Sequence, residues 1–244
     1  MAHHDSDLVH GVRVALMAAG DREQAAGMRA YMKSELPFRG VPSPLLRAIL
    51  TPLLAAHDLY DERTWRASIL ELWDQAAFRE ERYAALALAR HRRYRAWRRP
   101  STLPLYAHLI RSGGWWDLVD EIATHLVREQ LLAEPEEVAP VVRAWAVDEN
   151  RWVRRTAIIC QVGAQEQVDQ DLLAETIEAN LDGSTRTGPP LSPHGRDFFV
   201  RKAIGWALRD HARTDPDWVR SFVTDHEDRL AGLSRREALR VIGG

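Results

Sequence analysis

The sequence predicts an all-α protein, and three observations carry that prediction. Apolar residues recur at three- and four-residue spacing along most of the chain, which places them on one face of a helix. Proline and glycine fall between these segments, as expected for residues that end helices and form turns. The chain shows no period-two alternation and no strand-length cluster of β-branched residues, which are the usual marks of strands. About a dozen helices of roughly 10–18 residues result.

Successive segments are expected to form antiparallel pairs of about 35–40 residues, the length of HEAT or armadillo repeats. The expected pairs are 61–74 with 78–92, 115–132 with 136–147, and 150–163 with 167–181. No strict sequence repeat is visible, so the repeat is structural and degenerate. Stacked pairs of this kind form a solenoid with a concave binding surface. We therefore predict a HEAT-like or armadillo-type α-solenoid as a single domain over 1–244, with N-terminal helices within 1–57 and one long loop over 182–197.

Residues that favour helix N-termini mark where several helices should begin. Such residues accept hydrogen bonds from backbone N–H groups that have no partner inside the helix, and proline suits the first helical position. The expected starts are Ser43–Pro44, Asp61, Asp148, Asp215–Pro216 and Ser234.

The composition narrows the class of protein. The chain has 244 residues, a net charge of −2 and 45% hydrophobic residues, which is typical of a globular protein and not of a globally basic nucleic-acid binder. No run of about 18 apolar residues occurs, so no membrane span is expected. The N-terminus lacks a basic start followed by a long apolar run, so we expect no signal peptide. One cysteine, Cys160, allows no internal disulfide and fits a cytoplasmic location.

No motif points to a metal or to an organic cofactor, and we expect none. The sequence holds no glycine-rich phosphate loop, no GxSxG and no HExxH, the short motifs that carry such chemistry. The ten histidines are scattered, without a pair at metal-ligand spacing. Cys160 falls on a helix flank and is interpreted as a small core residue.

The segment GGWWDLVDEIA at 113–123 combines two tryptophans with acidic residues. At 100° per residue, Trp115 falls on the apolar stripe and is expected in the core. Trp116 and Asp120 fall together on the flank of that stripe, one turn apart. They present either an aromatic face beside a working carboxylate, or a partly buried tryptophan beside a solvated aspartate.

The segment DENRWVRRTAIICQ at 148–161 places a charge among apolar residues. Arg155 lies in the middle of the apolar face, while Arg154 projects elsewhere, near Gln161. An unpaired buried charge is costly, so Arg155 needs a partner. The partner is a carboxylate such as Asp120, an external phosphate, or another group in a structural ion pair between helices.

Two further segments are candidates for a nucleic-acid surface, because aromatic side chains and cations alternate in them. In RDFFVRKAIGWALRDHA at 196–212, Trp206 borders the edge from which Lys202 and Arg209 project. Between residues 184 and 213 basic residues outnumber acidic ones by four. The second run, RHRRYRAWRR at 90–99, either follows a phosphate backbone or is a solvated helix end, and we favour the solvated end.

Taken together, these segments resemble the DNA alkylation repair family, the AlkD-like alkylpurine DNA glycosylases built from HEAT-like repeats. The similarity runs from about residue 28 to residue 240. The matching stretches are MRAYMKSELPFRGVPSP, ELWD, WWDLVD, DENRWVRRTAI, FFVRKAIGWALR and LSRREAL. The loop 182–197 looks longer than the corresponding connection in the family, and arginine stands at most positions where relatives often use lysine.

The resemblance implies a function and assigns roles to residues. It implies an all-helical solenoid that wraps duplex DNA and removes cationic N3- and N7-alkylated purines, with no need to flip the base. We expect the protein to be a monomer with no obligatory protein partner and no cofactor. By motif, Asp120 matches the catalytic aspartate, and Trp116 and Trp206 match the active-site tryptophans. Residues expected to contact DNA are Arg155, Arg209, Lys202 and Tyr31, the last as a tyrosine that lines the cleft.

Two other functions remain open for a helical repeat protein, because a fold does not determine a function. A non-catalytic HEAT-like protein that binds branched or damaged DNA would need the basic face but neither Asp120 nor the tryptophans. A protein–protein scaffold would need none of them, and structural ion pairs would account for the arginine on the apolar face.

Overall fold

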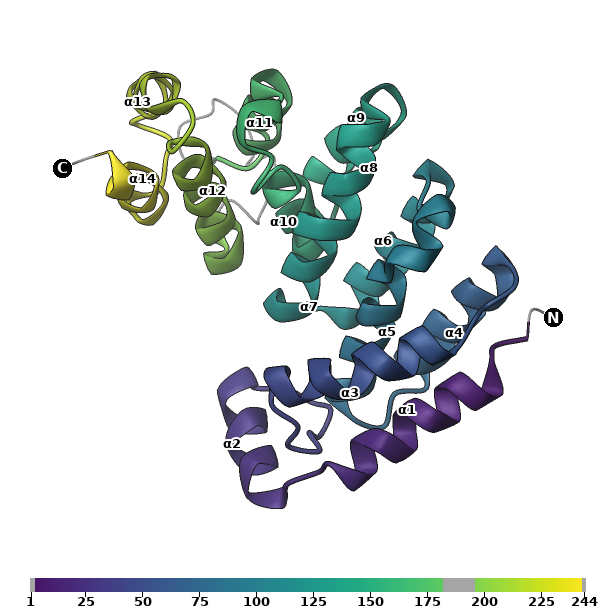
Figure 1. Ribbon diagram of the computed structural model, residues 1–244. Coiled ribbons are helices and arrows are strands. Elements are labelled where there is room, and N and C mark those ends of the chain that lie inside the picture. Colours follow the sequence, from purple (N-terminus) through teal and green to yellow (C-terminus); the bar gives the residue numbers. More distant parts are fainter. Residues whose placement is uncertain (1–2, 182–195, 243–244) are drawn as a thin grey trace. The chain divides into compact units, whose positions relative to one another are not determined.

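The computed structural model describes residues 3–181 and 196–242 (Figure 1). Within these ranges all regular structure is helical and no strand occurs, which confirms the all-α prediction. The chain divides into two compact units, Met1–Arg98 and Arg99–Gly244. Each unit is described by itself, and the single domain expected over 1–244 stays a prediction.

In the first unit, α4 packs against α5, α1 and the segment η1. Trp65 and Trp73 of α4 are completely buried, as are Leu8 and Leu16 of α1. The helices of this unit are α1 (Ser6–Ala18), α2 (Arg22–Met32), α3 (Ser43–Ala56), α4 (Glu62–Asp74), α5 (Arg79–Arg90) and the 3₁₀ segment η1 (Arg92–Trp97).

The second unit contains the elements on which most of the candidate site residues lie. Its 3₁₀ and π segments are η2 (Pro100–Thr102), η3 (Ile122–Val127), η4 (Gln165–Gln167) and η7 (Leu239–Val241). Its α-helices are α6 (Leu103–Gly113), α7 (Trp116–Glu121), α8 (Arg128–Ala133), α9 (Pro135–Ala146), α10 (Arg151–Ile159), α11 (Gln170–Glu178), α12 (Phe198–His211), α13 (Pro216–Asp225) and α14 (Gly232–Ala238).

The three expected helix pairs are present. They are α4 with α5, the continuous helix α7–η3–α8 with α9, and α10 with α11. In each pair a short connection returns the chain beside the preceding helix (Figure 1). Two prolines depart from the expected pattern, because Pro52 and Pro140 lie inside α3 and α9 rather than between helices.

Helix starts were predictable where the side chain of the capping residue accepts a hydrogen bond from the first turn of its own helix. Asp61 Oδ1 accepts from the Thr64 N–H at 2.7 Å, and Asp215 Oδ1 accepts from the Trp218 N–H at 2.9 Å. Both residues are N-caps, as expected. The start of α3 at Ser43 is also confirmed.

Two expected starts are wrong, because the polar side chains have other partners. The N-cap of α10 is Asn150 rather than Asp148, since Asp148 is held by an ion pair with Arg111. Ser234 lies inside α14, where its hydroxyl is buried and donates to the Arg201 carbonyl at 2.9 Å.

The basic run at 90–99 belongs to the first unit up to Arg98. Tyr94 is buried, its ring stacks on Trp97 at 5.0 Å, and its hydroxyl donates to the His57 carbonyl. Arg93 donates through Nη1 to the same carbonyl at 2.7 Å and through Nη2 to Ala55 O at 3.1 Å. The run therefore includes an arginine that satisfies the C-terminal carbonyls of α3, and it is not simply a solvated helix end.

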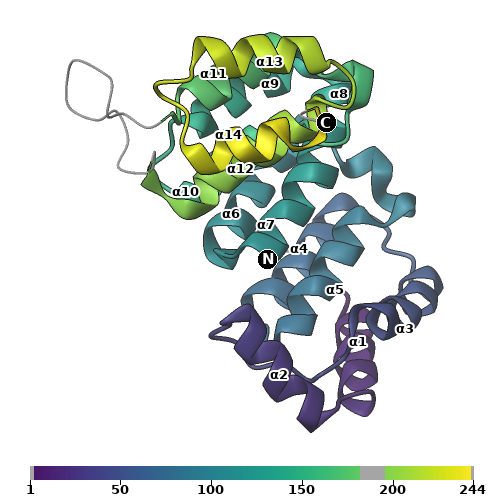
Figure 2. The same cartoon turned by 90° about the vertical axis from the view of Figure 1, so that its left-hand side faces the viewer.

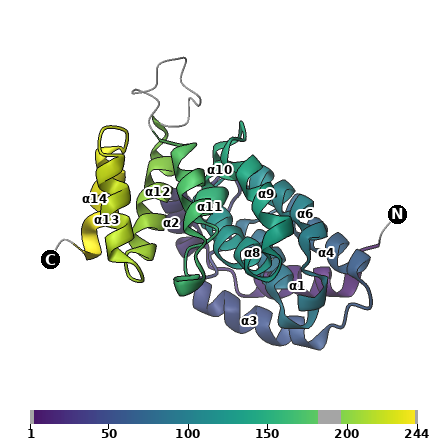
Figure 3. The same ribbon diagram turned by 90° about the horizontal axis from the view of Figure 1, so that it is seen from above.

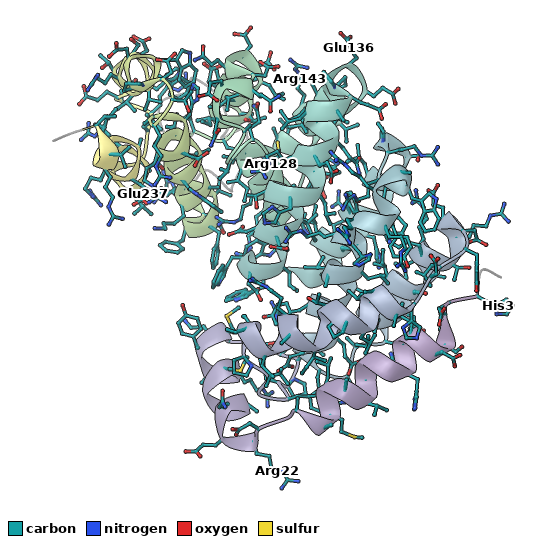
Figure 4. All side chains as sticks on the ribbon, in the orientation of Figure 1. His3, Arg22, Arg128, Glu136, Arg143 and Glu237 are labelled. Atoms are coloured by element: carbon teal, nitrogen blue, oxygen red, sulfur yellow. The ribbon has the colours of Figure 1, made fainter. Side chains whose placement is uncertain are left out.

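Neighbouring helices fix the turn that follows α10. Gly163 has a φ of +82°, and a Cβ at this position would lie 2.2 Å from Arg128 Nη1. Arg128 of α8, labelled in Figure 4, donates to the Val162 carbonyl at 2.5 Å. Asp210 of α12 accepts from the Gly163 N–H at 2.6 Å. The C-terminal end of α10 is thus held from two sides.

Helices α12 and α14 lie side by side, as Figures 2 and 3 show. Their contact centres on Gly205, where a Cβ would lie 2.7 Å from the Glu237 Cβ and 3.2 Å from the Ser234 carbonyl oxygen. Only a residue without a Cβ allows the two backbones to approach this closely.

Most of the expected loop 182–197 lies outside the described residues, which resume at Arg196, and so does Arg186 of the basic segment. None of the described helices combines the length and the apolar character that crossing a membrane would require.

Replacing Gly205 with alanine should destabilise the protein. Alanine favours a helix over glycine by about 1 kcal/mol, but the added methyl group would press against Glu237 Cβ and the α14 backbone, and such overpacking costs about 1–3 kcal/mol. We expect a net loss of up to about 2 kcal/mol, measured as a lower urea midpoint.

The matched control is Gly27→Ala, because Gly27 lies inside α2 and a Cβ there would meet nothing within 4 Å. This variant should gain about 0.5–1 kcal/mol from its helix propensity alone. Equal stability of the two variants would contradict the close contact between α12 and α14.

Candidate functional site

The candidate site begins where α7 starts, directly after Gly113–Gly114. Gly114 has a φ of +46° and is the C-cap of α6, so the chain turns sharply before Trp115, the extended N-cap of α7. Trp116 is then the first helical residue and Asp120 lies one turn later. The flank position expected for this pair is confirmed, since both residues are half-buried.

Asp120 lies two residues before η3, a π-helical segment inside the continuous helix from Trp116 to Ala133. Here the Thr124 hydroxyl donates to the Asp120 carbonyl at 2.8 Å. A π segment widens the helix, and such segments occur often at functional sites. A helical wheel drawn at a constant 100° per residue therefore predicts the relative positions of Trp116 and Asp120. It does not predict the positions of the residues in the π segment that follows.

Arg155 of α10 forms a two-point ion pair with Asp120. Its Nε donates to Asp120 Oδ1 at 2.7 Å and its Nη2 donates to Oδ2 at 2.8 Å. Its Nη1 donates to the Phe199 carbonyl oxygen of α12 at 2.7 Å. The exposed fractions of the two side chains are only 7% for Arg155 and 16% for Asp120. The arginine on the apolar face therefore has an internal partner, and that partner is Asp120.

Burial perturbs the acidity of this carboxylate. It raises the pKa of the Asp120 carboxyl above its ordinary value, and the negative charge of Asp117 acts in the same direction. The hydrogen bonds and positive charge of Arg155 oppose that rise. An acid whose pKa is shifted by burial and by a specific charged partner is a candidate functional group.

Helix α10 lies between α7 and α12 (Figure 1) and is buried along its length after Arg151. Arg154 is buried as well, with an exposed fraction of 4%. It donates to the carbonyls of Ala146, Val147 and Asp148 and to the Asn180 side chain. Arg154 thus satisfies the C-terminal carbonyls of α9 and fixes α10 against it.

An aromatic ring lies beside the ion pair, and an aromatic cluster joins the same helices. The Trp206 ring of α12 lies 5.9 Å from the Arg155 guanidinium carbon, within the range of a cation–π interaction. Trp115, Trp152 and Phe199 form a cluster with ring centroids 4.8–5.9 Å apart. The structure therefore brings Asp120, Arg155 and Trp206 together, with Trp116 one turn away on α7.

The other candidate residues have different surroundings. Arg209 is ion-paired with Glu237 of α14, labelled in Figure 4, and burial lowers the pKa of Arg209. Lys202 is half-buried and makes no ion pair with any of the residues described here. Tyr31 lies on α2 of the first unit, where 77% of it is exposed.

No group of three or more His, Cys, Asp or Glu residues in the described part of the chain is arranged to hold a metal ion. Cys160 is completely buried, and burial raises the pKa of its thiol to about 12. A thiol with that pKa is not a nucleophile at neutral pH, so the interpretation of Cys160 as a core residue is confirmed.

Three residues near the ion pair received no role from the sequence. Asp197 is the N-cap of α12, and its position before an apolar helical run was a local signal that could have identified it. Arg151 forms an ion pair with Asp197. Phe199 contributes both its ring and its carbonyl oxygen. The pairing of Arg151 with Asp197 had no sequence signal.

Comparison with known proteins places this chain in a family. The sequence model of a family described as DNA alkylation repair enzyme matches residues 12–242. Among solved structures, the chain is similar to a "Predicted DNA alkylation repair enzyme from Enterococcus faecalis", with 29% sequence identity and a TM-score of 0.75. That match covers 91% of this chain and 95% of the other. A search of curated proteins found no match.

The family match spans both compact units and includes every candidate site residue, and the solved relative shares the α-solenoid fold. The ion pair of Asp120 with Arg155 and the nearby Trp206 thus lie in a chain with a role in the repair of alkylated DNA, and the chain belongs to the DNA alkylation repair enzyme family.

Proposed function

We propose that this protein is a DNA glycosylase that hydrolyses the N-glycosidic bond of cationic N3- and N7-alkylpurines in duplex DNA. The observation that carries the proposal is the Asp120 carboxylate, which is mostly buried, held at two points by Arg155 and accompanied by Trp116 and Trp206. Membership of the DNA alkylation repair enzyme family supports DNA as the substrate.

The reaction suits a site that offers a carboxylate but no general acid. Alkylation at N3 or N7 makes the purine cationic, so the base leaves as a neutral molecule when it takes the electron pair of the C1′–N bond. The sugar becomes positively charged in the transition state, as in glycoside hydrolysis. Water then forms the new bond to C1′ and releases a proton.

Asp120 would stabilise the developing charge on the sugar and orient the water. A fixed negative charge acts strongly in a site with little solvent, and Asp120 is mostly buried. The faces of Trp116 and Trp206 would contact the deoxyribose and the cationic base, since an aromatic face attracts a cation.

Arg155 would act first as the residue that aligns Asp120. Three of its five N–H groups are engaged by Asp120 and Phe199, and a guanidinium has five in all. The remaining two would be available to a phosphate next to the lesion. Lys202, Tyr31 and, after release from Glu237, Arg209 are the further proposed DNA contacts.

The ion pair of Arg155 with Asp120 does not by itself distinguish the glycosylase from the non-enzymatic alternatives. A DNA-binding protein or a scaffold could contain the same contact as a structural ion pair between helices. Excision activity distinguishes the three functions, because only the glycosylase produces abasic sites.

Asp120→Asn should nearly abolish excision. Loss of one well-placed electrostatic group typically lowers a rate by about 10²–10³-fold, whereas DNA binding should change little because asparagine keeps the shape. The measurement is the single-turnover rate of alkali-labile product from a duplex with one N7-methylguanine, with binding followed by fluorescence anisotropy.

Asp117→Asn is the matched control, since it removes a carboxylate from the same helix, three residues before Asp120. It should keep excision within a few-fold of the wild type. Normal excision by Asp120→Asn would exclude Asp120 as the catalytic group. Salt-sensitive binding by the wild type without any abasic product would favour the DNA-binding alternative.

The rate of excision should fall as the pH decreases through the raised pKa of Asp120. The ionised carboxylate is the active form, so the rate is highest above this pKa and lost below it. The inflection should lie above the ordinary aspartate value of 3.8, after subtraction of spontaneous depurination.

Because the charge of Asp117 contributes to the raised pKa of Asp120, Asp117→Asn should move this inflection to lower pH. A rate that does not change between pH 4 and pH 8, or an inflection that moves to higher pH in Asp117→Asn, would contradict the assignment of Asp120.

A further inference from the structure

We propose that Asp197 is a positioning residue for the excision reaction. It fixes the first turn of α12 and, with it, the Phe199 carbonyl that holds Arg155, which in turn holds the Asp120 carboxylate. The inference rests on the proposed function, because it assigns Asp197 a role in holding Arg155 and Asp120 in position for excision.

The two carboxylate oxygens of Asp197 have separate tasks. Oδ1 accepts from the backbone N–H groups of Phe199 at 2.8 Å and Val200 at 3.3 Å. Oδ2 pairs with Arg151 Nη1 at 3.0 Å. Asp197 therefore caps α12 and at the same time ties its first turn to α10.

The capped turn provides the third contact of Arg155. The Phe199 carbonyl oxygen accepts from Arg155 Nη1 at 2.7 Å, and a carbonyl has two lone pairs, so this contact coexists with the helical hydrogen bond of α12. The Phe199 N–H is held by Asp197, so the peptides on both sides of the Phe199 Cα are restrained.

The Phe199 ring adds a second restraint on the same turn. It packs on Trp152 of α10 at 4.8 Å and on Trp115, the N-cap of α7, at 5.4 Å. The Arg151 guanidinium lies 5.2 Å from the Trp152 ring and 5.9 Å from the Phe199 ring. The ion pair of Arg151 with Asp197 thus lies against the aromatic cluster that joins the three helices of the site.

Other aspartates cap helices in this chain without such a connection. Asp169 caps α11 through its Oδ1, which accepts from the Leu172 N–H at 2.9 Å. Among the described contacts, its carboxylate forms no ion pair with α10 and the helix it caps holds no part of Arg155. Asp169 therefore serves as a control for the loss of a cap alone.

The first test compares Asp197→Ala with Asp169→Ala. Displacing a catalytic group through a distant change can lower a rate by about 10–100-fold, and we expect a loss in that range for Asp197→Ala in single-turnover excision at saturating enzyme. The dissociation constant for DNA should stay within a few-fold of the wild type. Asp169→Ala should lose stability only.

The pH dependence separates positioning from a general loss of structure. The charges that act on Asp120 among the described residues are Arg155 of α10 and Asp117 of α7. A less firmly held Arg155 would stabilise the ionised Asp120 carboxylate less. The pH at which the excision rate falls on acidification should therefore be higher in Asp197→Ala than in the wild type. Asp197→Ser keeps a cap acceptor but not the ion pair, so its rate and its pH dependence should lie between those of Asp197→Ala and the wild type.

A readout that does not need activity keeps this inference separate from the proposed function. The pKa of the Asp120 carboxyl, measured by carbon-detected NMR on the full chain, should rise in Asp197→Ala and not in Asp169→Ala. If the wild type excises nothing but this rise is seen, the glycosylase proposal fails, and the role of Asp197 in positioning Arg155 and Asp120 stands. An unchanged Asp120 pKa, or equal rates for Asp197→Ala and Asp169→Ala in the presence of wild-type excision, would overturn the role of Asp197.

Discussion

The arrangement of the second unit depends on one constraint, which is that a buried guanidinium needs a negatively charged partner. Arg155 lies among apolar side chains with an exposed fraction of 7%, and an unpaired charge in such a place would cost several kcal/mol. Asp120 supplies two contacts and the Phe199 carbonyl supplies a third. Because these partners lie on α7 and α12, the pairing of one side chain fixes three helices relative to one another.

That constraint also explains how a stable core and a reactive group coexist. The same burial that makes Arg155 depend on Asp120 raises the pKa of the Asp120 carboxyl, so the carboxylate is held in place but poorly solvated. Fixed charges of this kind are effective in catalysis because they need no reorganisation during the reaction. An ordinary surface ion pair would offer neither the fixed geometry nor the low polarity.

Support for the site extends to the C-terminal helices. Gly205 lets α14 approach α12 closely, and Glu237 of α14 pairs with Arg209 of α12. On the other side, Arg128 and Asp210 hold the turn at Gly163 that ends α10. The helices that carry Trp206 and Arg155 are therefore also held in place by contacts that do not involve Asp120.

The sequence by itself determined the helical class, the helix pairs, the caps at Asp61 and Asp215, and the need of Arg155 for a partner, because periodicity and capping act within a few residues. Only the tertiary structure decided that the partner is Asp120, 35 residues away, and that Phe199, 44 residues away, completes the contact. In the structure, Asp148 and Ser234 also bind other partners instead of capping helices, and Arg154 is buried. The physical reason is that local hydrogen bonds depend on spacing along the chain, whereas the pairing of a buried charge depends on which helices pack together.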